Sequence, residues 1–161
     1  MIKRRNDMAV QIDDNLKKLF EDETSIKLIG TVDKNGVPHV VRKQYLTLDE
    51  NHNLLLYELL ESSRNNRNLV YSLWFDKLVS VQITKNNESY EVIARPVKSV
   101  TAGHDFERIY ENIREKLGDV DLGAIWTLIP VEIRNESFLV RQREEEEQYP
   151  ILRHLDRVTV S

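Results

Sequence analysis

Two β-rich runs joined by a turn that contains Asn-Gly constrain the fold of this chain more than any other feature. The first run spans residues 25–32, residues 33–36 read Asp-Lys-Asn-Gly, and the second run starts at Val37. Asn-Gly tolerates the positive φ angles that a tight β-turn requires, so this stretch predicts a β-hairpin. We expect the second strand to run to about Leu48 and to turn at residues 49–53 into a third strand, 54–57. Such a meander favours an antiparallel sheet or barrel.

The remainder of the chain mixes helix and strand patterns. Apolar residues three and four apart predict helices over about 12–22, from Ser62 or Ser63 onward, and over about 106–117, where Gly118 ends the helix. Strands are expected at 78–84, at 89–100 with Pro96 at an edge or bulge, and at 124–129, where Pro130 breaks the strand; 131–133 and 137–140 are candidates to continue the sheet. The pattern predicts an antiparallel β domain of roughly six strands with two or three packed helices.

Length and composition narrow the class of protein. The chain has 161 residues and a formal net charge of -4, and it contains no cysteine. We expect one domain over residues 1–161, with its core at about 25–140 and a charged C-terminal tail at 141–161. The mean hydropathy of -0.49 and the lack of a long apolar run indicate no transmembrane segment and no membrane partner.

The same composition excludes several kinds of site. The absence of cysteine excludes a disulfide scaffold and thiolate metal sites, and it favours a cytoplasmic location, as does an N-terminus without the apolar core of a signal peptide. The sequence pI of about 5.6 predicts no nucleic-acid partner. The four histidines, His39, His52, His104 and His154, lack metal-ligand spacing, so no metal site is expected.

The junction at residues 62–69, Ser-Ser-Arg-Asn-Asn-Arg-Asn-Leu, is the first candidate site. It places Ser62, Ser63, Arg64 and Arg67 where a strand gives way to a helix. Free backbone N–H groups and the positive end of the helix dipole suit a phosphate there, and arginine adds a fork of donors. The alternative is a serine-capped surface helix with solvated arginines.

A second polar cluster, Arg42-Lys43-Gln44, lies in the middle of the expected second strand. Charge inside a core strand is costly without a partner. This stretch therefore either faces solvent or lines a polar ligand site.

The order of these features resembles the pyridoxamine 5'-phosphate oxidase-like FMN-binding split barrels. Residues 28–41, LIGTVDKNGVPHVV, have the form of that family's opening hairpin, and residues 63–69 have the form of its helix start. The resemblance covers roughly residues 28–133. It implies a mainly β (α+β) fold, a six-stranded antiparallel split β-barrel with two or three flanking helices. It also implies bound FMN and a homodimer.

The resemblance further implies roles at the helix start. Ser63 and Arg64 match the family's contacts to the FMN phosphate. Asn65 occupies a position where many members have lysine or threonine, which alters one phosphate ligand. We infer that Arg67 compensates for this change.

Other matched positions concern the flavin ring. Arg42, Lys43 and Gln44 lie on the strand that in the family runs along the flavin ring and ribityl chain. Tyr57 matches an aromatic position before the phosphate site. Trp126 matches an aromatic residue that is presented to the ring from the second subunit; the alternative is a core tryptophan.

These implications predict an FMN-dependent oxidoreductase that passes electrons between a reduced donor and a small-molecule acceptor, with no catalytic residue assigned. The alternatives are a non-catalytic module that binds flavin, haem or a deazaflavin, and a barrel that has lost its ligand and acts as an interaction domain. The C-terminal residues 151–158 depart from the substrate motif of the true pyridoxamine-phosphate oxidases. The acidic run 144–147 is either a solvated face or a tail folded over the partner's flavin edge.

Overall fold

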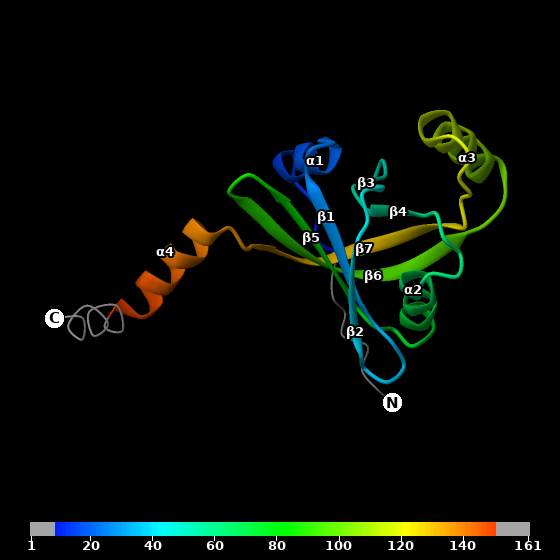
Figure 1. Cartoon of the computed structure of the whole chain (residues 1–161). Coiled ribbons are helices and arrows are strands. Elements are labelled where there is room, and N and C mark those ends of the chain that lie inside the picture. The colour runs from blue at the N-terminus through cyan, green and yellow to red at the C-terminus, as the bar shows by residue number, and fades with distance from the viewer. Residues whose placement is uncertain (1–8, 151–161) are drawn as a thin grey trace.

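Seven strands and four helices make up the part of the chain that the computed structural model describes, residues 9–150 (Figure 1). The strands are β1 Ile26–Val32, β2 Pro38–Arg42, β3 Leu46–Leu48, β4 Leu54–Glu58, β5 Val79–Lys85, β6 Glu88–Val100 and β7 Ala124–Asn135. The helices are α1 Asp14–Glu21, α2 Arg64–Trp74, α3 His104–Leu117 and α4 Phe138–Gln148. All strands pair antiparallel in the order β2-β1-β5-β6-β7-β4-β3. The predicted mainly β, α+β class is thus confirmed, whereas the predicted counts of strands and helices are too low.

The predicted opening hairpin is confirmed. β1 and β2 pair from Val32 with Pro38 to Leu28 with Arg42. Gly36 has a φ of 77°, a left-handed conformation that glycine adopts without strain. The turn chemistry in the sequence therefore sets the register of this hairpin.

The sheet curls because the chain passes from one of its edges to the other within three residues. β2 and β3 are the edge strands, and only residues 43–45 separate them in sequence. The N–H of Lys43 donates to the carbonyl of Lys27 in β1 (2.9 Å), and the N–H of Tyr57 in β4 donates to the carbonyl of Tyr45 (3.0 Å). The two edges meet at this linker, giving a curled half-barrel. The continuous second strand predicted from the sequence is therefore wrong.

The prolines of the two long strands lie at bulges. The pairing of β6 with β7 shifts register between Ile93 and Ala94 and again between Pro96 and Lys98, and Ala94 pairs with Pro130. The predicted bulge at Pro96 is confirmed. The predicted break at Pro130 is wrong, because an irregularity in the ladder accommodates a residue that has no N–H to donate.

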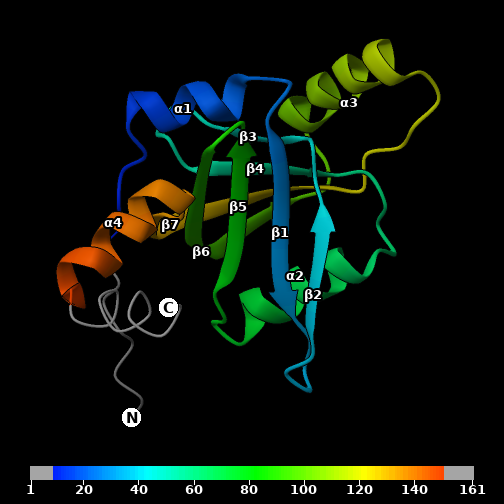
Figure 2. The same cartoon turned by 60° about the vertical axis from the view of Figure 1, so that its left-hand side comes forward.

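Helices close the two ends of the half-barrel. α1 starts at its N-cap Asp13, whose side chain accepts from the N–H of Leu16. In both Figure 1 and Figure 2, α1 lies at one end of the strands and α2 at the opposite end. The main core joins α1 to the inner face of the sheet, and a smaller cluster joins α3 to β7.

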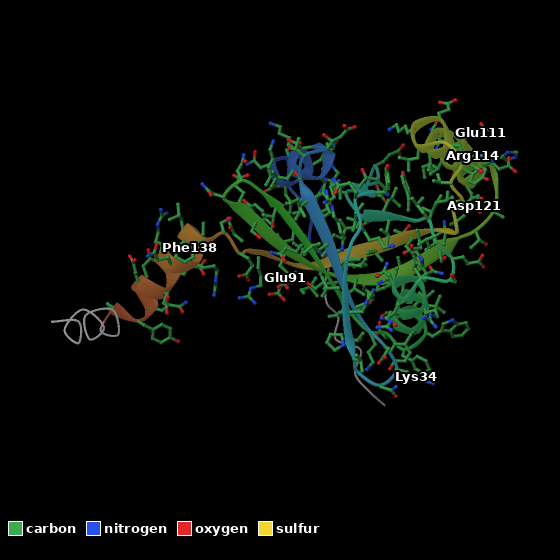
Figure 3. The ribbon with its side chains drawn as sticks, in the orientation of Figure 1. Lys34, Glu91, Glu111, Arg114, Asp121 and Phe138 are labelled. Carbon is green, nitrogen blue, oxygen red and sulfur yellow. The ribbon has the colours of Figure 1, made fainter. Side chains whose placement is uncertain are left out.

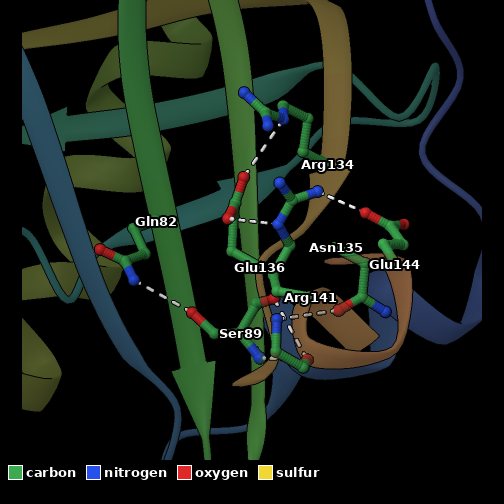
Figure 4. A network of polar contacts seen from close by, with 8 residues as sticks. Gln82, Ser89, Arg134, Asn135, Glu136, Arg141 and Glu144 are labelled. Carbon is green, nitrogen blue, oxygen red and sulfur yellow. Dashed lines mark hydrogen bonds and ion pairs between the residues drawn. The ribbon is translucent and has the colours of Figure 1, made fainter. Parts of the chain in front are cut away.

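α4 is a helix where the sequence offered 137–140 as a candidate to continue the sheet. Ser137 precedes it, with its N–H donating to Oδ1 of Asn135 (3.0 Å). Figure 4 shows Glu136 between Arg134 and Arg141 at this junction, with N–O distances of 3.2 and 3.7 Å. These local polar contacts end the strand, and α4 extends away from the sheet with none of its residues buried (Figure 1). The remainder of the predicted tail, residues 151–161, lies outside the described residues.

Within residues 9–150, no helix is both long enough and apolar enough to cross a bilayer.

Candidate functional site

An open cleft of about 1280 Å³ lies where the two edges of the sheet meet. Its walls come from the linker after β2, the end of β4 with the loop that follows, and the segment between α3 and β7. It is lined by Arg42, Lys43, Gln44, Tyr45, Tyr57, Leu59, Leu60, Glu61, Ser62, Tyr110, Asp119, Val120, Asp121, Leu122 and Gly123. The fold thus brings together five residues that the sequence analysis selected: Arg42, Lys43, Gln44, Tyr57 and Ser62.

Hydrogen bonds fix the linker as a wall of this cleft. Nε2 of Gln44 donates to the carbonyl of Ser25 (2.8 Å) and to that of Glu23 (3.2 Å). Nε of Arg42 donates to Oε1 of Gln44 at 3.4 Å, and the Arg42 side chain is exposed. Gln44 therefore holds the linker against the residues before β1 and leaves Arg42 accessible to a ligand.

Lys43 is held by a carboxylate that the sequence analysis did not select. Nζ of Lys43 donates to Oε1 of Glu58 at 2.7 Å, and the side chain of Glu58 is 0% exposed. Nδ2 of Asn65 donates to Oε2 of Glu58 at 3.0 Å. Strict alternation along β4 places Glu58 on the inner face with Leu54 and Leu56. This alternation could have identified Glu58 from the sequence as a buried carboxylate that requires hydrogen-bond donors.

The start of α2 presents free backbone donors beside the cleft. Ser63 is the N-cap, and its Oγ accepts from the N–H of Asn66 (3.0 Å). Within the described chain, no acceptor is found for the N–H groups of Arg64 and Asn65. The Arg64 and Arg67 side chains are exposed, and Ser62 lines the cleft just before the helix. Such a helix start is suited to an anionic group.

Two predicted residues are buried instead of facing the cleft. Asn65 is 1% exposed, and its Oδ1 has no hydrogen-bond partner among residues 9–150. Trp126 is also 1% exposed and belongs to the main core. Three further predicted residues do not line the cleft: Ser63, Arg64 and Arg67.

Aromatic side chains form part of the cleft wall. Tyr57 is half-buried, and burial raises the pKa of its hydroxyl. The positive charge of Arg108 lowers this pKa, but by less than burial raises it. Tyr110 receives a hydrogen bond from Nη1 of Arg114 (3.1 Å), and the guanidinium lies 5.5 Å from the centre of the tyrosine ring. Figure 3 shows Arg114 near Asp121 on the α3 side of the molecule. Tyrosine rings of this kind can form a wall for a flat ligand.

A close backbone contact fixes the far wall. A Cβ placed on Gly123 would lie 2.9 Å from the backbone nitrogen of Glu61, so only glycine fits there without a shift. The N–H of Gly123 also donates to the carbonyl of Glu58 (2.8 Å). The loop after β4 and the segment before β7 are therefore pressed together beneath the cleft.

Solved structures of other proteins share this fold. An FMN-binding protein from Syntrophomonas wolfei is 13% identical, with a TM-score of 0.61 over 76% of this chain and 84% of its own. A pyridoxamine 5'-phosphate oxidase-like protein from Lactobacillus delbrueckii is 15% identical, with a TM-score of 0.58 over 77% of this chain and 93% of its own. The resemblance predicted from the sequence is confirmed at the level of the fold.

Other structures that share the fold carry different names. The haem storage protein HutZ from Vibrio cholerae is 14% identical, with a TM-score of 0.54 over 78% of this chain and 95% of its own. An F420 reductase is also 14% identical and matches with a TM-score of 0.58 over 76% of this chain and 98% of its own. No family model and no curated protein matches the sequence.

Proposed function

We propose that this chain, which has the split-barrel fold of the pyridoxamine 5'-phosphate oxidase-like proteins, binds FMN in the cleft at the edge-to-edge linker. The observation that carries the proposal is the meeting of cationic, aromatic and hydroxyl side chains beside the free N–H groups of a helix start. Ligand pockets are typically about 300–1,000 Å³. The cleft, at about 1280 Å³, exceeds this range and has room for FMN. The residues present therefore fit the group.

The two ends of the cleft would hold different parts of the ligand. The start of α2, with Ser62, Arg64 and Arg67, offers backbone N–H groups and guanidinium donors to a phosphate. Tyr57 and the linker offer an aromatic wall and polar groups to a planar ring. FMN, when bound, supplies electron and hydride transfer, so we propose an oxidoreductase acting on a small-molecule donor and acceptor.

In this proposal the protein binds and tunes the cofactor. Arg42 places positive charge on the cleft wall, where it would stabilise negative charge on a bound ligand, and Lys43, whose charge is paired with that of Glu58, offers N–H donors. The aliphatic Leu59 and Val120 give other walls of the cleft an apolar surface. These are roles of binding, orientation and charge stabilisation.

A deazaflavin or haem in the same cleft is the second candidate, favoured by the names of the F420 reductase and the haem storage protein that share the fold. No histidine lines this cleft within residues 9–150, whereas Tyr45 and Tyr57 do, so a haem iron would need a ligand other than histidine. A deazaflavin with a phosphate group would use the start of α2 as FMN does.

We also propose a homodimer and a cytoplasmic location. The dimer is supported by large apolar side chains on the surface of the described chain: Trp74 and Phe75, at the end of α2, are 79% and 64% exposed. The location rests on the absence of cysteine from the sequence.

The test of the proposed function is a visible absorption spectrum of the purified protein, before and after incubation with FMN and desalting. Retained bands near ~370 and ~450 nm are expected from bound flavin. A protein that stays colourless would contradict the proposal, and a Soret band would support haem instead.

A further inference from the structure

The carboxylate of Glu58 joins the three elements that meet at the cleft. It lies at the end of β4, receives Nζ of Lys43 from the linker at 2.7 Å, and receives Nδ2 of Asn65 from the first turn of α2 at 3.0 Å. The backbone N–H of Leu60 approaches the same carboxylate at 3.4 Å. A buried charge is costly unless it is paired and hydrogen-bonded, so these donors account for its presence in the interior.

The pairing leaves donors of Lys43 unused. A lysine ammonium carries three N–H groups, and within the described chain the acceptor found for Lys43 is Glu58. The Lys43 side chain is 16% exposed and lines the cleft. One N–H is therefore committed to the interior, and the others remain available to a ligand.

We propose that Glu58 is a positioning residue: it holds the ammonium of Lys43 at the cleft wall, ready to donate to an oxygen of the bound ligand. Asn65 helps to orient the same carboxylate from α2. The ammonium is thereby placed before the ligand arrives, so binding does not need to order a long, flexible side chain. This inference rests on the proposed function for the identity of the ligand, but the placement of Lys43 belongs to the ligand-free protein.

A ligand-free measurement tests the placement directly. Lysine amines are reductively methylated with formaldehyde and borohydride, and the rate at each site is followed by mass spectrometry. Lys43 is expected to react several-fold faster in Glu58→Gln than in the unchanged protein, because the variant loses the charged partner. Lys34, exposed at the tip of the hairpin (Figure 3), is the internal standard. An unchanged Lys43 rate would overturn the inference even if FMN never binds.

The second measurement concerns FMN affinity. We expect Glu58→Gln to raise the Kd for FMN about tenfold or more, the scale of a displaced charge-assisted hydrogen bond. The matched control is Glu91→Gln on β6 (Figure 3), a partly buried carboxylate that does not line the cleft. It accepts a hydrogen bond of 2.8 Å from Oγ of Ser80. The control is expected to leave the Kd within about twofold.

A double-mutant cycle separates positioning from general structural support. If Glu58 acts through Lys43, Glu58→Gln changes the Kd little in a Lys43→Gln background. Full additivity would contradict the inference. Should Glu58→Gln fail to fold, as judged by circular dichroism, Glu58→Asp takes its place in all three measurements. The shorter side chain keeps the charge but withdraws the carboxylate from Nζ of Lys43, so the same changes in smaller measure are expected because the 2.7 Å hydrogen bond is lost.

Discussion

Trp126 and Asn66 connect the core of the sheet to the first turn of the helix beside the cleft. Nε1 of Trp126 in β7 donates to Oδ1 of Asn66 in α2 at 2.8 Å. Nδ2 of Asn66 in turn donates to the carbonyl of Glu61, in the loop that lines the cleft. A core tryptophan thus helps to set the position of α2 relative to the cleft.

Replacing Trp126 by phenylalanine is expected to lower the free energy of unfolding by about 1–3 kcal/mol, because Oδ1 of Asn66 loses its donor in a part-buried site. The measurement is urea denaturation followed by circular dichroism. Phe138→Leu on α4 is the control, since that side chain is 74% exposed, and a change below about 0.5 kcal/mol is expected there. Equal effects at the two positions would show that the Trp126–Asn66 contact contributes nothing specific.

Replacing Arg64 by alanine is expected to weaken FMN binding by about 1.5–3 kcal/mol, or about 10- to 150-fold in Kd, because a charge-assisted hydrogen bond to the phosphate is lost. A fluorescence titration with FMN measures this change. Riboflavin, which lacks the phosphate, is expected to bind the variant and the unchanged protein equally. Arg143→Ala, an exposed arginine on α4, is the control. An unchanged FMN affinity in Arg64→Ala would rule out this phosphate contact.

Lys27 predicts a pH dependence of stability. Its ammonium donates to the carbonyls of Phe20 (2.6 Å) and Leu46 (2.8 Å), and burial lowers its pKa below the usual 10.5. Between the lowered pKa and 10.5 the unfolded chain binds more protons than the folded one, so stability rises with pH in that window. In urea denaturation the unchanged protein should therefore gain stability relative to Lys27→Met as the pH approaches 10.5. A difference that does not vary with pH would contradict the assignment.

The exposed aromatic residues at the end of α2 predict an effect on assembly. Trp74→Glu is expected to shift the protein from dimer toward monomer, because a charge would be placed in an apolar contact. Sedimentation velocity measures the shift. Asn87→Glu, in the exposed turn between β5 and β6, is the control of equal charge. If the unchanged protein sediments as a monomer, the proposed homodimer is excluded at that concentration.

Local sequence determined the elements whose signals lie within a few residues. The Asn-Gly turn predicted the first hairpin, a serine at 62 or 63 predicted the start of α2, and Gly118 predicted the end of α3. Turn, cap and periodicity depend on neighbouring residues, so they can be identified without the tertiary structure. The proline rule failed at Pro130 because pairing across the sheet, which the local sequence does not report, accommodates it.

The cleft shows the same division. The sequence selected Arg42, Lys43 and Gln44 as a polar cluster and left open whether they face solvent or a ligand. It did not connect them to Glu58, because 15 residues separate Lys43 from Glu58 along the chain and a curled sheet brings them together. The local sequence thus identifies which polar groups a segment carries. Which distant groups they pair with depends on how the sheet curls.

The sequence alone therefore determined the class of fold, its opening hairpin and the helix start that suits an anion. The tertiary structure decided where the second strand breaks, that Trp126 and Asn65 are buried, and which carboxylate holds Lys43. The physical reason is that propensity and capping act over a few residues, whereas burial and ion pairing follow from contacts between segments far apart in the chain.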